Sequence, residues 1–284
     1  MDRGKNTYLA PDSTRSSAIS LPPPEFTIEV ARFYAGLVSC ACNPVGLDAE
    51  PNLGGQLFYA GELDAHGRAM VVAANIAGAA SLAAMGDETA QRLAVRDGVV
   101  DFLVNSLDEA LRILKNQIRK GETGAVCIAA TAEAVRAEML ERGVLPDLVR
   151  RVEELEDDSP FISQGARRIP AAVIDDALTM LAWSVASAPA QWLPKLDAVA
   201  MECVPDEDWK SRRWLRLSPR YLGRVAKGVR VLFCSGVAGA EFVRRVRERV
   251  ERGEIPVAVE IQVSGQRMRT DYRFAPSGAQ DGGM

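Results

Sequence analysis

Residues 99–130 read VVDFLVNSLDEALRILKNQIRKGETGAVCIAA, and they place a well-marked helix between two apolar runs. Ser106 and Glu109 have the spacing of a capping box, in which each side chain takes a backbone N–H at the start of a helix. The apolar residues that follow recur at helical spacing: Leu107, Leu111, Leu114 and Ile118. Because residues 99–104 and 125–130 are strand candidates, the stretch predicts a strand–helix–strand unit.

The same alternation extends on both sides of this unit. Further strand candidates are residues 56–60, 80–85 and 145–149. Further helix candidates are residues 25–40, 68–78, 87–96 and 131–142. Short apolar runs that alternate with amphipathic helices are typical of a parallel sheet covered by helices. We therefore predict an α/β, Rossmann-like fold with a mainly parallel sheet.

The pattern changes after residue 150, because residues 153–158 carry five carboxylates in six positions, which is typical of a solvated linker. The expected organisation is a disordered tail at 1–25, a Rossmann-like domain at 26–150, an acidic linker at 151–168, a smaller α/β domain at 169–265 and a tail at 266–284. In the smaller domain we expect helices at 170–185 and 239–252, and strands at 196–203, 230–234 and 256–263.

Composition excludes several classes of protein. The 284 residues carry a net charge of −4, which opposes a general nucleic-acid binder. The sequence contains no stretch of 18 apolar residues that is uninterrupted by a charged residue, as a membrane-spanning helix would require. The first 20 residues lack the apolar core of a secretory signal. We therefore expect a cytoplasmic protein with no membrane partner.

The cysteines and the single histidine limit the metal chemistry. The cysteines are Cys40, Cys42, Cys127, Cys203 and Cys234, and this scattered, odd set resembles neither a disulfide framework nor a zinc module. His66 is the only imidazole, so no site built on two histidines of one chain exists. Cys40 and Cys42 have metal-ligand spacing but few partners, and packed thiols explain them equally well. We expect no metal site.

The segment 59–67 lies between a strand and a helix, where a doubly wound fold binds the pyrophosphate of a dinucleotide. It contains Gly61 and Gly67 but lacks the third glycine of a full fingerprint. Glu62 and Asp64 would repel a phosphate. His66 lies in the same loop, and its side chain is suited to proton transfer near neutral pH.

A second candidate is the stretch 209–230, which combines basic and aromatic residues. Its members are Trp209, Lys210, Arg212, Arg213, Trp214, Arg216, Arg220, Tyr221, Arg224, Lys227 and Arg230. Such a pattern is compatible with stacking on bases and neutralising phosphates. It is equally compatible with a solvated helix face or a subunit contact.

Four segments, in order, resemble the Rossmann-like domain of the urocanase family: residues 60–67, 77–79, 106–111 and 132–147. The resemblance covers about a third of the chain. It implies an NAD-dependent lyase that hydrates urocanate in histidine metabolism. It implies cofactor contacts at Gly61, Gly67, Thr131 and Ala132. Residues 232–236, LFCSG, are similar to the family's LFCEG, so Cys234 joins His66 as a candidate catalytic residue.

The departures from the family pattern fall on the ligand-binding positions. The family's Gly-Met-Gly falls on residues 65–67, so only Gly67 is kept. The acidic residue that would hold a ribose falls on Met85, and an asparagine falls on Thr131. Each lost polar contact costs about 0.5–1.5 kcal/mol, and every 1.4 kcal/mol is tenfold in affinity. These losses together would abolish micromolar binding of NAD.

Three functional hypotheses follow. The leading one is a urocanase-like protein with a degenerate NAD site. Such a protein would bind a small-molecule ligand or have a regulatory role. The second is an active NAD-dependent urocanate hydratase-like lyase with a remodelled site. The third is a module that binds an anionic partner or nucleic acid through residues 209–230. The sequence leaves homo-oligomer formation open.

Overall fold

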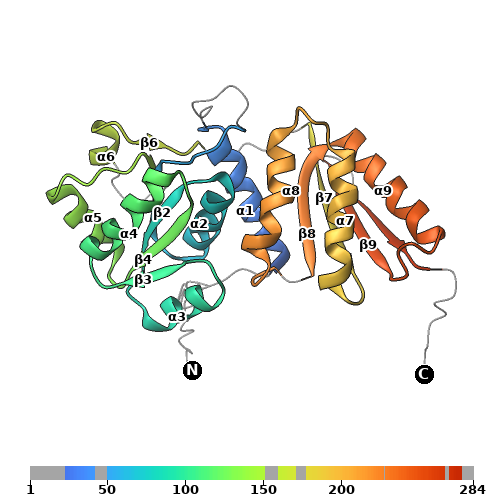
Figure 1. Cartoon of the computed structure of the whole chain (residues 1–284), viewed down its shortest axis with the longest axis horizontal. Helices are drawn as coiled ribbons and strands as arrows, with labels where there is room; N and C mark the ends of the chain where they lie inside the picture. The colour runs from blue at the N-terminus through green and yellow to red at the C-terminus, as the bar shows by residue number, and fades with distance from the viewer. Residues whose placement is uncertain are drawn as a thin grey trace, which may run out of the picture.

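The computed structural model describes residues 23–41, 50–150, 159–170, 177–226, 228–265 and 269–276. It contains two sheets, each with its own helices, and the two units lie side by side (Figure 1). The acidic run at 153–158, the predicted tail up to residue 22, and Cys42 lie outside the described residues.

The first sheet confirms the predicted Rossmann-like fold. Its strands are β1 (Leu57–Glu62), β2 (Ala80–Ala84), β3 (Phe102–Val104), β4 (Gly124–Ile128), β5 (Leu148–Val149) and β6 (Arg167–Arg168). They lie in the order β3-β4-β2-β1-β5-β6, and every pair is parallel. The residues of β2 and β4 are all buried, as expected for a parallel sheet covered on both faces.

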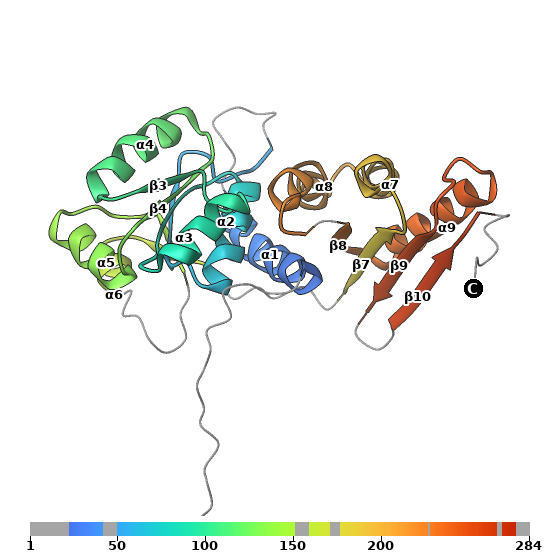
Figure 2. The same cartoon turned by 90° about the horizontal axis from the view of Figure 1, so that it is seen from below.

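Helices cover both faces of this sheet (Figure 2). They are α2 (Ala65–Ala77), α3 (Glu88–Arg96), α4 (Leu107–Lys120), α5 (Ala132–Glu141) and the short α6 (Ser159–Ser163). The predicted start of α4 is confirmed, because the hydroxyl of Ser106 accepts from Glu109 N at 3.3 Å. The donor to the Glu109 carboxylate is one residue away from the predicted one. The carboxylate accepts from Asn105 N rather than from Ser106 N.

The second sheet is antiparallel. Its strands are β7 (Leu178–Val185), β8 (Val229–Ser235), β9 (Val259–Ser264) and β10 (Arg269–Phe274), in the order β10-β9-β7-β8. Its helices are α7 (Pro189–Cys203), α8 (Trp209–Leu222) and α9 (Gly236–Glu251). The predicted strand at 230–234 and the predicted helix at 239–252 are confirmed by β8 and α9.

Several predicted elements are wrong. The predicted helix at 170–185 is wrong over residues 178–185, which form β7. These residues are apolar on both faces of the strand, so their sequence lacks the alternation that would indicate a strand. The predicted strand at 196–203 lies within α7, whose sequence holds good helix formers such as alanine, leucine and methionine. The predicted tail at 266–284 contains β10, and the predicted linker at 151–168 contains α6 and β6, which pairs with β5.

Helix α1 (Pro23–Val38) packs between the two sheets, beside α2 on one side and β8 on the other (Figures 1 and 2). Its buried face includes Phe26, Val30 and Leu37. The Tyr34 hydroxyl donates to Lys210 O at 2.9 Å, and its ring centre lies 5.3 Å from that of Trp214. One continuous apolar core therefore runs from the first unit through α1 into the second.

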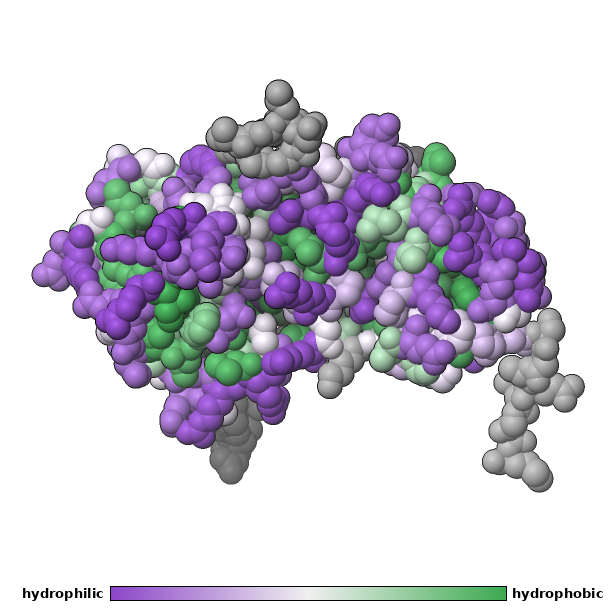
Figure 3. Space-filling model, in the orientation of Figure 1, coloured by the Kyte–Doolittle hydropathy of each residue, from purple (hydrophilic) through white to green (hydrophobic). Residues whose placement is uncertain are grey.

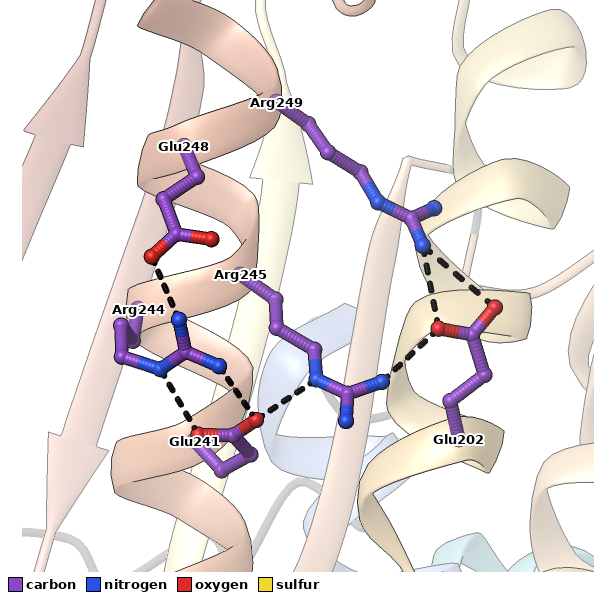
Figure 4. A network of polar contacts seen from close by, with 6 residues as sticks. All are labelled: Glu202, Glu241, Arg244, Arg245, Glu248 and Arg249. Atoms are coloured by element: carbon purple, nitrogen blue, oxygen red, sulfur yellow. Dashed lines mark hydrogen bonds and ion pairs between the residues drawn. The ribbon is translucent and has the colours of Figure 1, made fainter.

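An exposed ionic network ties α7 to α9. Glu202 of α7 accepts from Arg245 at 2.9 Å and from Arg249 at 3.0 Å (Figure 4). Hydrogen bonds from Arg244 and Arg245 lower the pKa of Glu241 to about 2. Figure 3 shows that the surface over α9 is strongly hydrophilic. Exposed ion pairs add little stability singly, so the network mainly fixes the register of the two helices.

We expect Tyr34→Phe to lower the free energy of unfolding by about 1 kcal/mol, because the carbonyl of Lys210 loses a part-buried hydrogen bond. Urea denaturation followed by circular dichroism measures the change. Tyr272→Phe is the matched control, because no hydrogen bond of the Tyr272 hydroxyl is found among the described residues. Equal effects of the two substitutions would contradict the role of Tyr34.

Candidate functional site

The carboxyl ends of β1 and β5 form the topological switch point of the first sheet. From β1 the chain continues to β2 on one side, whereas β5 joins β1 on its other side. In open α/β sheets, ligands bind in the crevice at such a point. Here β1 leads through Leu63 and Asp64 into α2, and β5 leads into Arg150.

A carboxylate of the chain itself lies at the start of α2. Asp64 is the N-cap residue, and its Oδ1 accepts from Gly67 N at 2.6 Å. The Arg150 guanidinium reaches across the switch point and donates to Asp64 Oδ2 at 3.0 Å, to Asp64 Oδ1 at 3.2 Å and to Glu62 O at 3.2 Å. Arg150 is only 14% exposed, so this ion pair is shielded on one side. The ion pair between Arg150 and Asp64 links the end of β5 to the turn between β1 and α2.

The two glycines of the loop have backbone roles. Gly61 adopts φ +68° where the pairing of β1 with β2 shifts register, a conformation that favours glycine. Gly67 lies so close to the end of β1 that a Cβ atom there would be 2.1 Å from Glu62 O. Both residues lie at the predicted cofactor loop, and the fold requires each of them without reference to a ligand.

The other predicted cofactor contacts lie two strands away. Thr131 is the N-cap of α5, and its Oγ1 accepts from Ala134 N at 3.3 Å. Ala132 O accepts from the Tyr59 hydroxyl at 3.0 Å, and this bond joins α5 to β1. Strand β2 separates β4, which precedes Thr131, from β1. Cofactor contacts at Thr131 and Ala132 therefore stay a prediction.

The end of β2 offers no carboxylate at the position where the family holds a ribose. Met85 is buried there, and its backbone N–H donates to Ile128 O at 3.1 Å. Its carbonyl accepts from Gln91 Nε2 at 2.7 Å. The next acidic residue, Asp87, caps α3 by accepting from Ala90 N at 2.7 Å.

His66 and Cys234 lie in different parts of the molecule. His66 is in the first turn of α2 and is 57% exposed, with its Nδ1 3.0 Å from Glu29 Oε1 of α1. Cys234 lies on β8 in the second unit and is 1% exposed. Burial and the nearby Asp208 carboxylate raise the pKa of Cys234 to about 12, so its thiol stays protonated at neutral pH. The structure does not bring the two predicted catalytic residues together.

Some arginines of the stretch 209–230 join the two units, whereas others bond within the second unit. Arg213 Nε donates to Ile76 O of α2 at 2.8 Å, and Arg224 donates to Arg96 O. Arg230 pairs with Asp197 at 3.1 Å. Trp214 is buried, and Lys227 lies outside the described residues. The basic and aromatic pattern therefore has a structural explanation at the junction of the two units.

A cavity of about 350 Å³ opens between α1, α8 and the strands β7 and β8. Its lining is mostly apolar, with Tyr34, Trp214 and Phe233 among the walls and Asp208 at the start of α8. Sequence reasoning missed this cavity, because its walls come from segments more than 130 residues apart. Only the packing of α1 against the second sheet brings them together.

None of the described helices is long and apolar enough to cross a membrane. No group of three or more His, Cys, Asp or Glu side chains within the described part of the chain is arranged to hold a metal ion.

We expect Cys234 to resist alkylation in the native protein, because a protonated, buried thiol is a poor nucleophile. The measurement is peptide mass spectrometry after iodoacetamide treatment at pH 8. The same reaction in urea, where Cys234 should be fully modified, is the control. Stoichiometric modification of Cys234 in the native protein would contradict this and would favour a catalytic thiol.

Residues 36–153 match the family model of the urocanase Rossmann-like domain. The match covers about two fifths of the chain and spans β1 to β5 with helices α2 to α5. It confirms the resemblance that the ordered motifs indicate, whereas the residues at the switch point differ from that pattern. This part of the chain is therefore similar to the urocanase Rossmann-like domain and departs from it at the switch point.

Proposed function

We propose that the chain is a ligand-binding or regulatory relative of urocanase whose Rossmann-like loop does not bind NAD. The observation that carries the proposal is the carboxylate of Asp64 at the start of α2. In dinucleotide-binding folds this helix start receives the pyrophosphate, because its N–H groups point outward and its dipole favours an anion. Asp64 already supplies the anion.

The electrostatics of the switch point support the same proposal. A pyrophosphate at α2 would face the carboxylate of Asp64, and Glu62 lies two residues earlier. Arg150 is the cation best placed to offset this repulsion, but its hydrogen bonds go to Asp64 and to Glu62 O. Displacing Asp64 would therefore break a shielded ion pair and uncap the helix. Loss of an Asp cap alone costs about 0.5–2 kcal/mol.

The position expected to hold the ribose of NAD offers no contact that would offset the repulsion at Asp64. In the dinucleotide-binding pattern an acidic side chain after the second strand holds the ribose hydroxyls. Met85 occupies that position, and the carboxylate of Asp87 caps α3. The cofactor implied by the family thus meets an anion where its phosphates belong and an apolar side chain where its ribose belongs. We derive no catalytic step through NAD.

Calorimetric titration tests the proposal with NAD and with inorganic pyrophosphate as probes. We expect no saturable binding of either probe to the native protein at millimolar concentration. In Asp64→Ser the hydroxyl keeps an N-cap, the negative charge is lost and Arg150 is released. We expect this variant to bind pyrophosphate saturably at millimolar concentration, where the native protein does not.

Asp87→Ser is the matched control, because it makes the same change at the N-cap of the neighbouring helix α3. It should leave pyrophosphate binding unchanged. Saturable micromolar binding of NAD to the native protein would overturn the proposal. Turnover of urocanate by that complex would then establish the alternative, an active hydratase-like lyase with a remodelled site.

A further inference from the structure

The cavity is lined by α1 on one side and by α8, β7 and β8 of the second unit on the other. Its volume of about 350 Å³ is in the range of small-molecule sites, which are concave, mainly apolar and provided with a few polar groups. The apolar lining includes Ala31, Val38, Leu178 and Leu232. The cavity is separate from the switch point of the first sheet, because none of its lining residues belongs to that sheet or to α2.

Two aromatic walls are fixed in position by hydrogen bonds at their polar ends. Trp214 Nε1 donates to Val231 O at 2.6 Å, and the Tyr34 hydroxyl donates to Lys210 O at 2.9 Å. Burial raises the pKa of the Tyr34 phenol, so this side chain stays neutral. Tyr34 is 5% exposed and Trp214 is 3% exposed, so each ring presents a small apolar part of its surface to the cavity. Such surfaces favour the apolar groups of a ligand, aromatic rings included.

The charged wall is Asp208. Its Oδ1 accepts from Ser211 N at 3.1 Å, and no described residue donates a hydrogen bond to its Oδ2. The other ionic lining residue is Lys210, whose ammonium lies 5.8 Å from the ring centre of Trp209. Trp209 is not a lining residue of the cavity. Because Asp208 Oδ2 accepts no hydrogen bond from the described residues, this carboxylate is the charged group that we assign to a cationic ligand.

We propose that this cavity binds a small aromatic amine, with its ring against Tyr34, Trp214 and Phe233 and its ammonium on the carboxylate of Asp208. The inference extends the ligand-binding role proposed above. Its site and its probes differ from those of the NAD test, so either proposal can fail without the other. Because α1 and α8 belong to the junction of the two units, a ligand here also stabilises the way they pack together.

Three probes of similar shape separate the contribution of charge from that of the apolar body. They are 2-phenylethylamine, 2-phenylethanol and 3-phenylpropionate, titrated calorimetrically at pH 7. We expect saturable binding of the amine, at least about tenfold tighter than that of the alcohol, since a hydrogen bond to a charged group exceeds a neutral one. The carboxylate should bind most weakly.

Asp208→Asn removes the charge and retains a good N-cap for α8, so the helix start is preserved. We expect it to weaken amine binding at least about tenfold and to leave alcohol binding unchanged. Asp206→Asn is the matched control, because Asp206 is 90% exposed, pairs with Arg212 and does not line the cavity. Thermal unfolding of both variants checks that they fold.

The proposal is overturned by any of three results. The first is the absence of saturable amine binding at millimolar concentration. The second is equal affinity for the three probes, which would indicate a merely apolar cavity. The third is an Asp208→Asn protein that folds and binds the amine as tightly as the native protein does.

Discussion

The carboxylate of Asp64 on the first turn of α2 is the contact on which the Rossmann-like unit depends. It caps the helix, and through Arg150 it joins the end of β5 to the end of β1. A parallel sheet needs its crossover helices fixed at their N-termini, where unpaired N–H groups collect. Other members of this fold class use an anionic ligand at this place. Here the carboxylate of Asp64 supplies an anion at that place.

Helix α1 provides the second constraint, because it buries one surface against α2 and another against β8. The basic and aromatic stretch that contains α8 completes this junction through Arg213 and Trp214. The same packing leaves the cavity beside Asp208. Binding at this cavity would affect how the two units are held together, and the regulatory role that we propose rests on this coupling.

The sequence predicts the first sheet well, because its signals are local. The Ser106 cap, the glycine at the end of α4 and the short apolar strands all act within a few residues. The second unit is predicted less well. Residues 178–185 are apolar on both faces and mimic a helix, whereas β10 is a six-residue edge strand whose place depends on its pairing with β9.

The candidate site shows the same limit. The departures at Glu62, Asp64 and Met85 are visible in the sequence and indicate that NAD fits poorly. The partner that makes Asp64 decisive, Arg150, lies 86 residues away and carries no local signal. The distance between His66 and Cys234 and the cavity at α1 likewise depend on tertiary packing. Motif order therefore indicates the resemblance to the urocanase domain, while the side-chain contacts at the switch point carry the proposal that NAD does not bind.

The most direct measurement is the nucleotide content of the protein as purified. The protein is denatured, the precipitate is removed, and the supernatant is separated chromatographically and compared with NAD standards. The account predicts no NAD at a level approaching one molecule per chain. Stoichiometric NAD would contradict it, because a resident dinucleotide would require the Asp64 carboxylate to leave the start of α2.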